Sequence, residues 1–140
     1  MSEELQKDLY MLQRHREQIE DIYGQVELIE RLIEEYENVV STLVEMQKLE
    51  EGKDTLMPVG ANIFLYSTIK DTSKVLARVG SKVYVEKSIP KAIEFINKKI
   101  EELRRNEESL VKTAREIRQK MDEISKRLKD KNVQVPEKKD

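Results

Sequence analysis

Two long stretches of this sequence place apolar residues at helical spacing, and this periodicity constrains the fold more than any other feature. The first series comprises Leu5, Leu9, Leu12, Ile19, Ile22, Val26, Ile29, Ile33, Tyr36, Val40 and Leu43. The second comprises Ile89, Ile93, Ile96, Ile100, Leu103, Leu110, Ala114, Ile117, Met121, Ile124 and Leu128. Alternating steps of three and four gather these side chains into one narrow stripe, which is typical of coiled coils. We therefore expect two long helices that pair along their apolar seams.

The ends of both expected helices carry capping signals. The first helix should cover about residues 4–51, because Gly52 is a natural C-cap. The second should cover 88–131, because Ser88 is a good N-cap and Pro90 suits a first helical turn. We treat the whole chain as a single domain.

The two seams agree in register if the helices run antiparallel. Helices of similar length that fold back on each other bring together residues whose numbers add up to about 140. Leu12 then meets Leu128, and Ile19 meets Met121. Beyond the second seam, residues 132–140 have no periodicity, so we expect a frayed tail there.

Three departures from a simple seam carry further expectations. Glu107 interrupts the second seam and should face Ile33 as a soft spot. His15 falls where the first seam shifts its spacing, which suggests either a pH-sensitive group or a partly exposed seam residue. A flanking apolar stripe suggests a second packing partner for the first helix: Leu28, Leu32, Val39 and Met46.

The charges favour pairing within the chain and exclude several classes of protein. Charged residues make up 39% of the sequence and aromatic residues 5%, which suits long helices rather than a compact globule. Residues 1–51 carry 14 acidic and 5 basic side chains, whereas residues 52–87 and 88–140 are net basic. The two expected helices therefore either attract each other through opposite charges or simply expose their charged faces to water. We expect no nucleic-acid binding, because no basic stripe with aromatic residues exists. Without a signal peptide or an apolar run of membrane-spanning length, a soluble, cytoplasmic protein is expected.

The segment 54–87 between the helices has the period of strands. Four short runs rich in β-branched and aromatic residues are bounded by turn signals: Thr55–Val59, Ile63–Ile69, Val75–Val79 and Lys82–Glu86. We interpret them as two hairpins, with Gly60 and Asn62 able to take positive φ and Gly80-Ser81 as a two-residue loop. Pro58 should lie at an edge or a bulge.

These strands place apolar side chains on both faces of a very small β unit. Four short strands cannot cover both faces by themselves, so another chain should cover one of them. We therefore expect oligomerisation through this segment, with these residues in the interface: Ile63, Phe64, Leu65, Val75, Val79, Val83 and Val85.

Catalytic chemistry is absent from the sequence, so an enzyme is not expected. There is no cysteine, and His15 is the single histidine. Neighbouring carboxylates such as Glu34 and Glu35 do not face each other on a helix, so they form no catalytic pair. The glycines fit no phosphate-binding pattern. We predict no catalytic residue, no metal ligand and no cofactor.

The free ends of the helix pair concentrate adaptable apolar residues. Methionine is favoured on surfaces that accept many partners, because its flexible side chain repacks easily. A frayed end could therefore expose these residues to a non-native protein, or they could close the seam on each other. The residues are Leu5, Leu9, Tyr10, Met11, Leu12, Ile117, Met121, Ile124 and Leu128.

The order helix, two hairpins, helix resembles the α subunit of archaeal prefoldin. The specific part of the match covers about residues 55–95 and consists of Leu56-Met57-Pro58-Val59-Gly60-Ala61, Ile69-Lys70-Asp71, Val79-Gly80, Tyr84-Val85-Glu86-Lys87 and Ala92-Ile93-Glu94-Phe95. Asn62 departs from the family, which has glycine there; asparagine tolerates the same left-handed conformation. The fold class is thus mainly α with a small β segment.

The resemblance implies a function that the residues alone do not give. It implies a hexamer of two α and four β subunits, in which the hairpins form β barrels. It also implies an ATP-independent chaperone that holds unfolded proteins (clients) at the free ends of its helices and passes them to a group II chaperonin. The alternative is a structural or filament-forming coiled-coil protein that assembles through the same hairpins.

Overall fold

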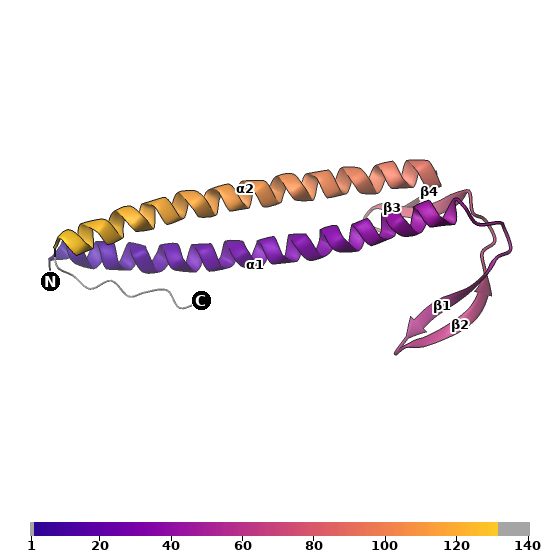
Figure 1. Ribbon diagram of the computed structural model, residues 1–140, viewed down its shortest axis with the longest axis horizontal. Coiled ribbons are helices and arrows are strands. Elements are labelled where there is room, and N and C mark those ends of the chain that lie inside the picture. Colours follow the sequence, from indigo (N-terminus) through magenta and orange to yellow (C-terminus); the bar gives the residue numbers. More distant parts are fainter. Residues whose placement is uncertain (1, 132–140) are drawn as a thin grey trace. The chain divides into compact units, whose positions relative to one another are not determined.

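The computed structural model describes residues 2–131 and consists of two long helices, with two β-hairpins between them in the sequence (Figure 1). Helix α1 spans Glu3–Met46 and helix α2 spans Ile89–Asp130. The strands are β1 (Asp54–Gly60), β2 (Ile63–Thr68), β3 (Lys74–Gly80) and β4 (Val83–Ser88). The helices are antiparallel, which confirms the predicted fold class. The expected tail of residues 132–140 lies outside the described residues.

The backbone falls into two compact units, which are described separately. In unit 1, residues 2–31 of the first half of the chain pair with residues 103–131. Unit 2 comprises Leu32–Glu102 and therefore holds both hairpins together with the adjoining halves of α1 and α2.

Unit 1 is held together by the two apolar seams. One cluster centres on Ile19, Ile22, Ala114 and Ile117, with Val26, Leu110 and Met121 packed against it. The other joins Leu12 to Ile124 and Leu128, and these are joined by Leu5, Leu9, Met11 and Met121. Leu12 and Leu128 share a cluster, as do Ile19 and Met121, so the packing agrees with the antiparallel register that the sequence predicts.

The predicted shift of the α1 seam at His15 does not occur. Asp8, Leu12, His15 and Ile19 are all buried, so the steps of three and four continue without interruption through two polar residues. The apolar pattern conceals this continuity, because it places Leu9 in the seam, whereas the neighbouring Asp8 is the buried seam residue and Leu9 is only partly buried. His15 is accordingly buried rather than partly exposed, and its Nδ1 lies 3.0 Å from Gln18 Oε1.

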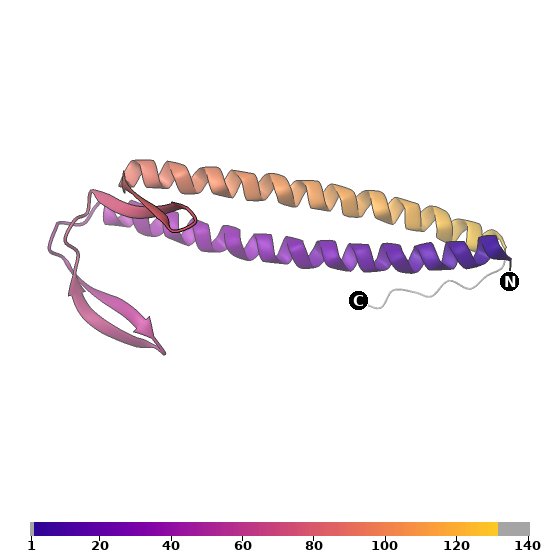
Figure 2. The same ribbon diagram turned by 180° about the vertical axis from the view of Figure 1, so that it is seen from behind.

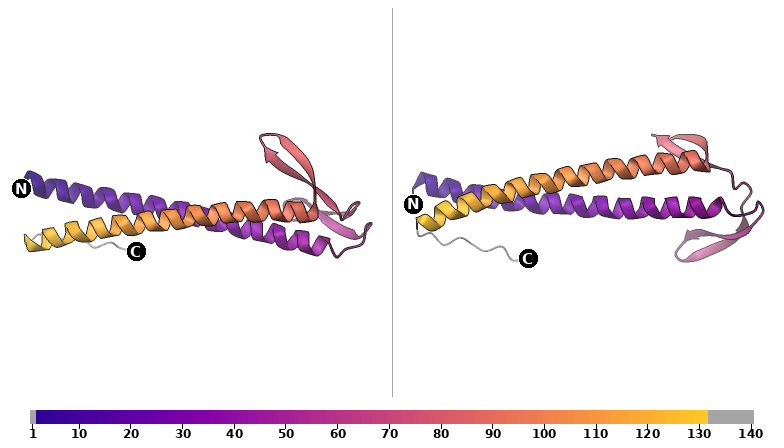
Figure 3. Two further views of the ribbon diagram at one scale, coloured as in Figure 1. Left: turned by 90° about the horizontal axis from the view of Figure 1, so that it is seen from above. Right: turned by 45° about the horizontal axis from the view of Figure 1, so that its top comes forward.

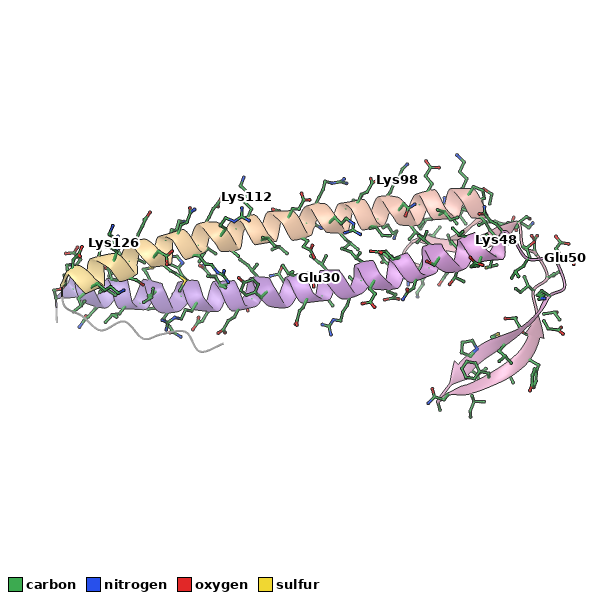
Figure 4. All side chains as sticks on the ribbon, viewed as in Figure 1. Glu30, Lys48, Glu50, Lys98, Lys112 and Lys126 are labelled. Carbon is green, nitrogen blue, oxygen red and sulfur yellow. The ribbon has the colours of Figure 1, made fainter. Side chains whose placement is uncertain are left out.

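Unit 2 packs the first turns of α2 against the last turns of α1. Its cluster consists of Leu43, Ile89 and Ala92, with Met46, Ile93 and Val75 of β3 packed against it. Ser88 caps α2 as predicted, because its Oγ accepts a hydrogen bond from the amide of Lys91 at 3.3 Å. Charged side chains cover the outer surface; Lys98 extends from α2 away from α1 in Figure 4.

The hairpins are two separate two-stranded antiparallel sheets, β1–β2 and β3–β4, which diverge from each other in Figures 2 and 3. In each, the register shifts by one residue just before the turn, between Pro58 and Gly60 and between Arg78 and Gly80. The bulge expected next to Pro58 is thus present.

The turn of the second hairpin lies one residue later than predicted. Ser81 and Lys82 form the loop, and Gly80 instead pairs with Val83. Lys82 therefore takes the positive φ (60°), as Ala61 and Asn62 do in the first hairpin. A two-residue turn that matches the twist of the strands needs positive φ in its loop. Because the bulge moves the loop past Gly80, Lys82 adopts the positive φ instead of the glycine.

Helix α1 ends at Met46, five residues before the predicted end at 51. The amides of Lys48 and Leu49 donate to carbonyls only three residues back, at 3.0 and 3.1 Å, which tightens the chain into a turn. The Gly52 amide donates to the Ile69 carbonyl at 2.8 Å. Gly52 thus extends the pairing of the first hairpin and does not cap the helix.

Within residues 2–131, neither helix is long and apolar enough to cross a membrane.

Candidate interaction surfaces

The β1–β2 hairpin exposes apolar side chains on both of its faces. Cross-strand partners point to the same face, so Leu56 and Tyr66 share one face while Met57 and Leu65 share the other. Tyr66 is 94% exposed. The large apolar residues of this hairpin that lie roughly half or more in solvent are Leu56, Met57, Val59, Ile63, Phe64, Leu65 and Tyr66. Apolar residues gathered on both faces of a hairpin make it a candidate interaction surface.

The β3–β4 hairpin differs because one of its strands touches the helices. Val75 and Ala77 of β3 are partly buried, and Val75 packs against the cluster around Leu43 and Ile89. Beside this contact lies a groove of about 250 Å³. Its walls come from α1, β3 and α2, and they include Tyr36, Val39, Leu43, Val75, Ala92, Phe95 and Ile96. The groove explains part of the flanking stripe on α1: β3 is the second packing partner near Met46, whereas Leu28 in unit 1 is exposed.

Polar contacts fix the approach to this second hairpin. The Asp71 carboxylate accepts hydrogen bonds from the Ser73 amide (2.7 Å) and the Ser73 hydroxyl (2.6 Å), and these bonds lower the pKa of Asp71. Lys74 Nζ lies 2.9 Å from Glu86 Oε1 across the strands, and this hydrogen bond raises the pKa of Lys74. The Ile89 amide then donates to the Ser73 carbonyl at 3.0 Å, which ties the linker to the start of α2.

Most of the predicted interface residues are exposed on the two hairpins. Ile63, Phe64 and Leu65 lie on β2, and Val79, Val83 and Val85 lie on β3 and β4. Val75 differs, since it packs on its own chain. Sequence reasoning omitted further exposed apolar residues: Leu56, Met57, Val59, Tyr66, Leu76 and Tyr84. For Met57 the signal was present, because its cross-strand partner Leu65 was among the predicted residues and the two share a face.

The second surface is the end of unit 1, where α1 begins and α2 ends; it is called the tip here and comprises residues 3–15 and 117–130. Tyr10 is 63% exposed, whereas the other predicted tip residues are buried or partly buried. Seven of them share one cluster: Leu5, Leu9, Met11, Leu12, Met121, Ile124 and Leu128. Ile117 belongs to the neighbouring cluster. The tip residues therefore close the seam on each other in this structure.

Charged residues bind the two helices together at the tip. Asp8 is 7% exposed, and its Oδ1 accepts a hydrogen bond from Arg127 Nη2 at 2.9 Å. This bond lowers the pKa of Asp8 and raises that of Arg127. Lys131 Nζ lies 3.5 Å from Glu4 Oε1 in a more exposed pair. Further along unit 1, the buried Oε2 of Glu107 has no hydrogen-bond partner within the described residues, as suits a soft spot.

Metal-binding geometry does not occur in the described part of the chain. Among residues 2–131, no group of three or more histidine or carboxylate side chains could hold a metal ion.

Comparison with known proteins identifies the family. The family model described as "Prefoldin subunit" matches residues 15–134. The chain belongs to the prefoldin family. It is similar to prefoldin subunit alpha 1 of Methanocaldococcus jannaschii, with 31% identity over 91% of this chain and 87% of that protein. Prefoldin subunit alpha of Thermofilum pendens is 38% identical over 84 residues, which cover 60% of this chain and 65% of the relative.

A solved structure supports the prefoldin fold. The chain resembles a chain in the cryo-EM structure of filamentous PFD from Methanocaldococcus jannaschii, with a TM-score of 0.77 and 23% identity. The match covers 82% of this chain and 95% of the other.

Its archaeal relatives identify the chain as a prefoldin α subunit, as the residues of its hairpins suggested. Membership implies a chaperone role and assembly with prefoldin β subunits. The prefoldin family is non-enzymatic, which agrees with the missing catalytic residues.

Proposed function

We propose that this prefoldin α subunit assembles with β subunits into a hexamer of two α and four β subunits that holds non-native proteins without ATP. The clients bind at the tip and pass from there to a group II chaperonin. The protein works in the cytoplasm.

The exposed hairpins carry the assembly part of this proposal. Each face of β1–β2 presents apolar residues to solvent, Leu56 and Tyr66 on one and Met57 and Leu65 on the other. An isolated hairpin that is apolar on both faces has little stability in water, and its edge strands leave backbone groups unpaired. Pairing with strands of other subunits covers the apolar faces and satisfies these backbone groups. In the α2β4 hexamer the hairpins of neighbouring subunits therefore supply the missing cover.

The apolar cluster of the tip supports the client-binding part. Met11, Met121, Leu5 and Leu9 are only partly buried, so small movements of the terminal turns change how much apolar surface they present. Weak contacts from several tips in one assembly add through multivalency and remain reversible. Such contacts suit a chaperone that must release what it holds.

A filament is the second candidate, because a structural relative of this fold is a filamentous assembly. Light scattering coupled to size-exclusion chromatography separates the two. The hexamer predicts one closed mass that forms only when β subunits are mixed with this chain. Open-ended masses that grow with concentration would instead support the filament.

Truncation of the tip tests client binding. Removal of residues 1–12 and 121–140 should leave the assembly mass unchanged, because the hairpins are intact, and should weaken suppression of client aggregation. The measurement is light scattering from guanidinium-unfolded citrate synthase diluted into the assembled protein. Full suppression by the truncated assembly would contradict client binding at the tip.

A further inference from the structure

Two of the core positions nearest the start of α1 are polar. Asp8 and His15 lie in the same heptad series as Leu12 and Ile19, and both are buried. The neighbouring cluster of unit 1, around Ile19, Ile22, Ala114 and Ile117, has only apolar members. The seam therefore changes character within unit 1, from apolar in the interior to partly polar at the tip.

Asp8 makes one strong contact across the seam. Its Oδ1 binds Arg127 at 2.9 Å, while its Oδ2 is buried without a hydrogen-bond partner within the described residues. Arg127 directly precedes Leu128, which is 0% exposed and contributes to the cluster with Leu12. The ion pair thus joins the two helices beside the most deeply buried apolar contact of the tip.

The surroundings of this pair allow it to open. The Arg127 side chain is 50% exposed, so its charged group already reaches water. A hollow of about 380 Å³ borders the pair, with Lys7, Met11, His15, Lys120, Glu123 and Ile124 among its lining residues. When the helices separate, water can solvate both Asp8 and Arg127. An ion pair in a partly wet seam therefore stabilises the closed state less than an apolar pair of similar size does.

We propose that the Asp8–Arg127 pair is a latch that holds the apolar tip residues together and lets them separate for a non-native client, an inference that rests on the proposed client-binding role of the tip. A segment of the client then replaces the contacts among Leu9, Leu12 and Leu128. The latch keeps these residues covered when no client is present, which limits association between tips.

Two substitutions of Asp8 distinguish a latch from a merely stabilising ion pair. Asp8→Leu supplies an apolar seam residue and should close the tip. Asp8→Asn keeps the shape of the side chain, removes its charge and should loosen the tip. Glu4→Gln is the matched control, because it removes the charge of the exposed Glu4–Lys131 pair. All variants are studied as full chains assembled with β subunits, and light scattering verifies their mass.

Hydrogen exchange of peptides from residues 3–16 and 117–130 reports how often the tip opens. We expect exchange about tenfold slower for Asp8→Leu, several-fold faster for Asp8→Asn and only slightly faster for Glu4→Gln, whose pair with Lys131 is exposed. Suppression of citrate synthase aggregation should be weaker for Asp8→Leu and at least as strong for Asp8→Asn. Faster exchange in both Asp8 variants would overturn the latch, since a stabilising pair alone predicts that outcome.

The latch and the proposed function fail in different experiments. If Asp8→Leu slows exchange while suppression stays at the wild-type level, and truncation of the tip abolishes suppression, then the tip binds clients without a latch. If truncation leaves suppression intact, client binding at the tip itself is wrong.

Discussion

The two hairpins of unit 2 have nearly the same turn but different surroundings. Val59-Gly60-Ala61-Asn62-Ile63 and Val79-Gly80-Ser81-Lys82-Val83 both form two-residue loops with the same shift of register, although Ala61 has a positive φ and Ser81 does not. Yet β1 is exposed along its whole length, whereas β3 packs Val75 against the helices. The shared loop length and register shift follow from similar local sequences, whereas the different burial depends on how each hairpin is connected to the helices.

The connection to α2 accounts for this difference. Strand β4 ends at Ser88 and α2 begins at Ile89, so no linker separates the second hairpin from the helix pair. The first hairpin is joined to α1 by residues 47–53 and to β3 by residues 69–73. The direct connection to α2 keeps the second hairpin beside the helices, whereas longer connections separate the first hairpin from them.

Charges introduced into either hairpin should have the largest effect. Val83→Asp with Val85→Asp on β4, and Ile63→Asp with Leu65→Asp on β2, each bury two carboxylates in the proposed interface, which is strongly unfavourable. Both pairs should abolish the assembly with β subunits. An intact oligomer by light scattering in either case would show that the hairpin concerned lies outside the interface.

Shortening one apolar side chain in each hairpin should change the stability of the isolated chain by different amounts. Val75→Ala should lower the free energy of unfolding of the isolated chain by about 1 kcal/mol, because it removes packing on the helix cluster. Met57→Ala should change it by less than about 0.5 kcal/mol, because Met57 is about half exposed in the isolated chain and belongs to no core cluster. Urea unfolding measures both, and equal effects would contradict the difference in burial.

Glycine at the turns should stabilise the two hairpins alike. Ala61 and Lys82 hold φ at 49° and 60°, a conformation that costs roughly 1 kcal/mol for residues with a side chain. Ala61→Gly and Lys82→Gly should each recover part of this cost, offset by the greater entropy of glycine in the unfolded chain. Asn62→Gly serves as the control with the smallest gain. Thermal unfolding of the isolated chain measures the three variants.

Acid should loosen the second hairpin's linker and produce the smallest effect. The hydrogen bonds from Ser73 lower the pKa of Asp71, so the ionised carboxylate stabilises the folded linker above the ordinary value of 3.8. This contribution disappears as the pH falls below that value, when the carboxylate becomes protonated. Hydrogen exchange of the Ser73 amide should accelerate there in the wild type and show no such step in Asp71→Asn.

The pattern of residues predicted more of the fold than of the interaction surfaces. Heptad spacing, the Ser88 cap and the turn residues predicted both helices, their antiparallel register and the two hairpins. The exact ends failed where long-range hydrogen bonds intervene: Gly52 pairs with Ile69, and the bulge moves the second turn to Lys82. Polar seam residues also escaped prediction, because hydrophobic periodicity registers only apolar side chains.

The sequence by itself determined the order of helices and hairpins, the apolar part of the seam and the family, because these depend on local spacing and on short motifs. Only the tertiary structure decided that Val75 packs on its own helices while Tyr66 remains in solvent. Only it placed Arg127 beside Asp8, 119 residues earlier in the chain. Such contacts depend on the alignment of segments far apart in sequence, where a shift of one turn changes every partner.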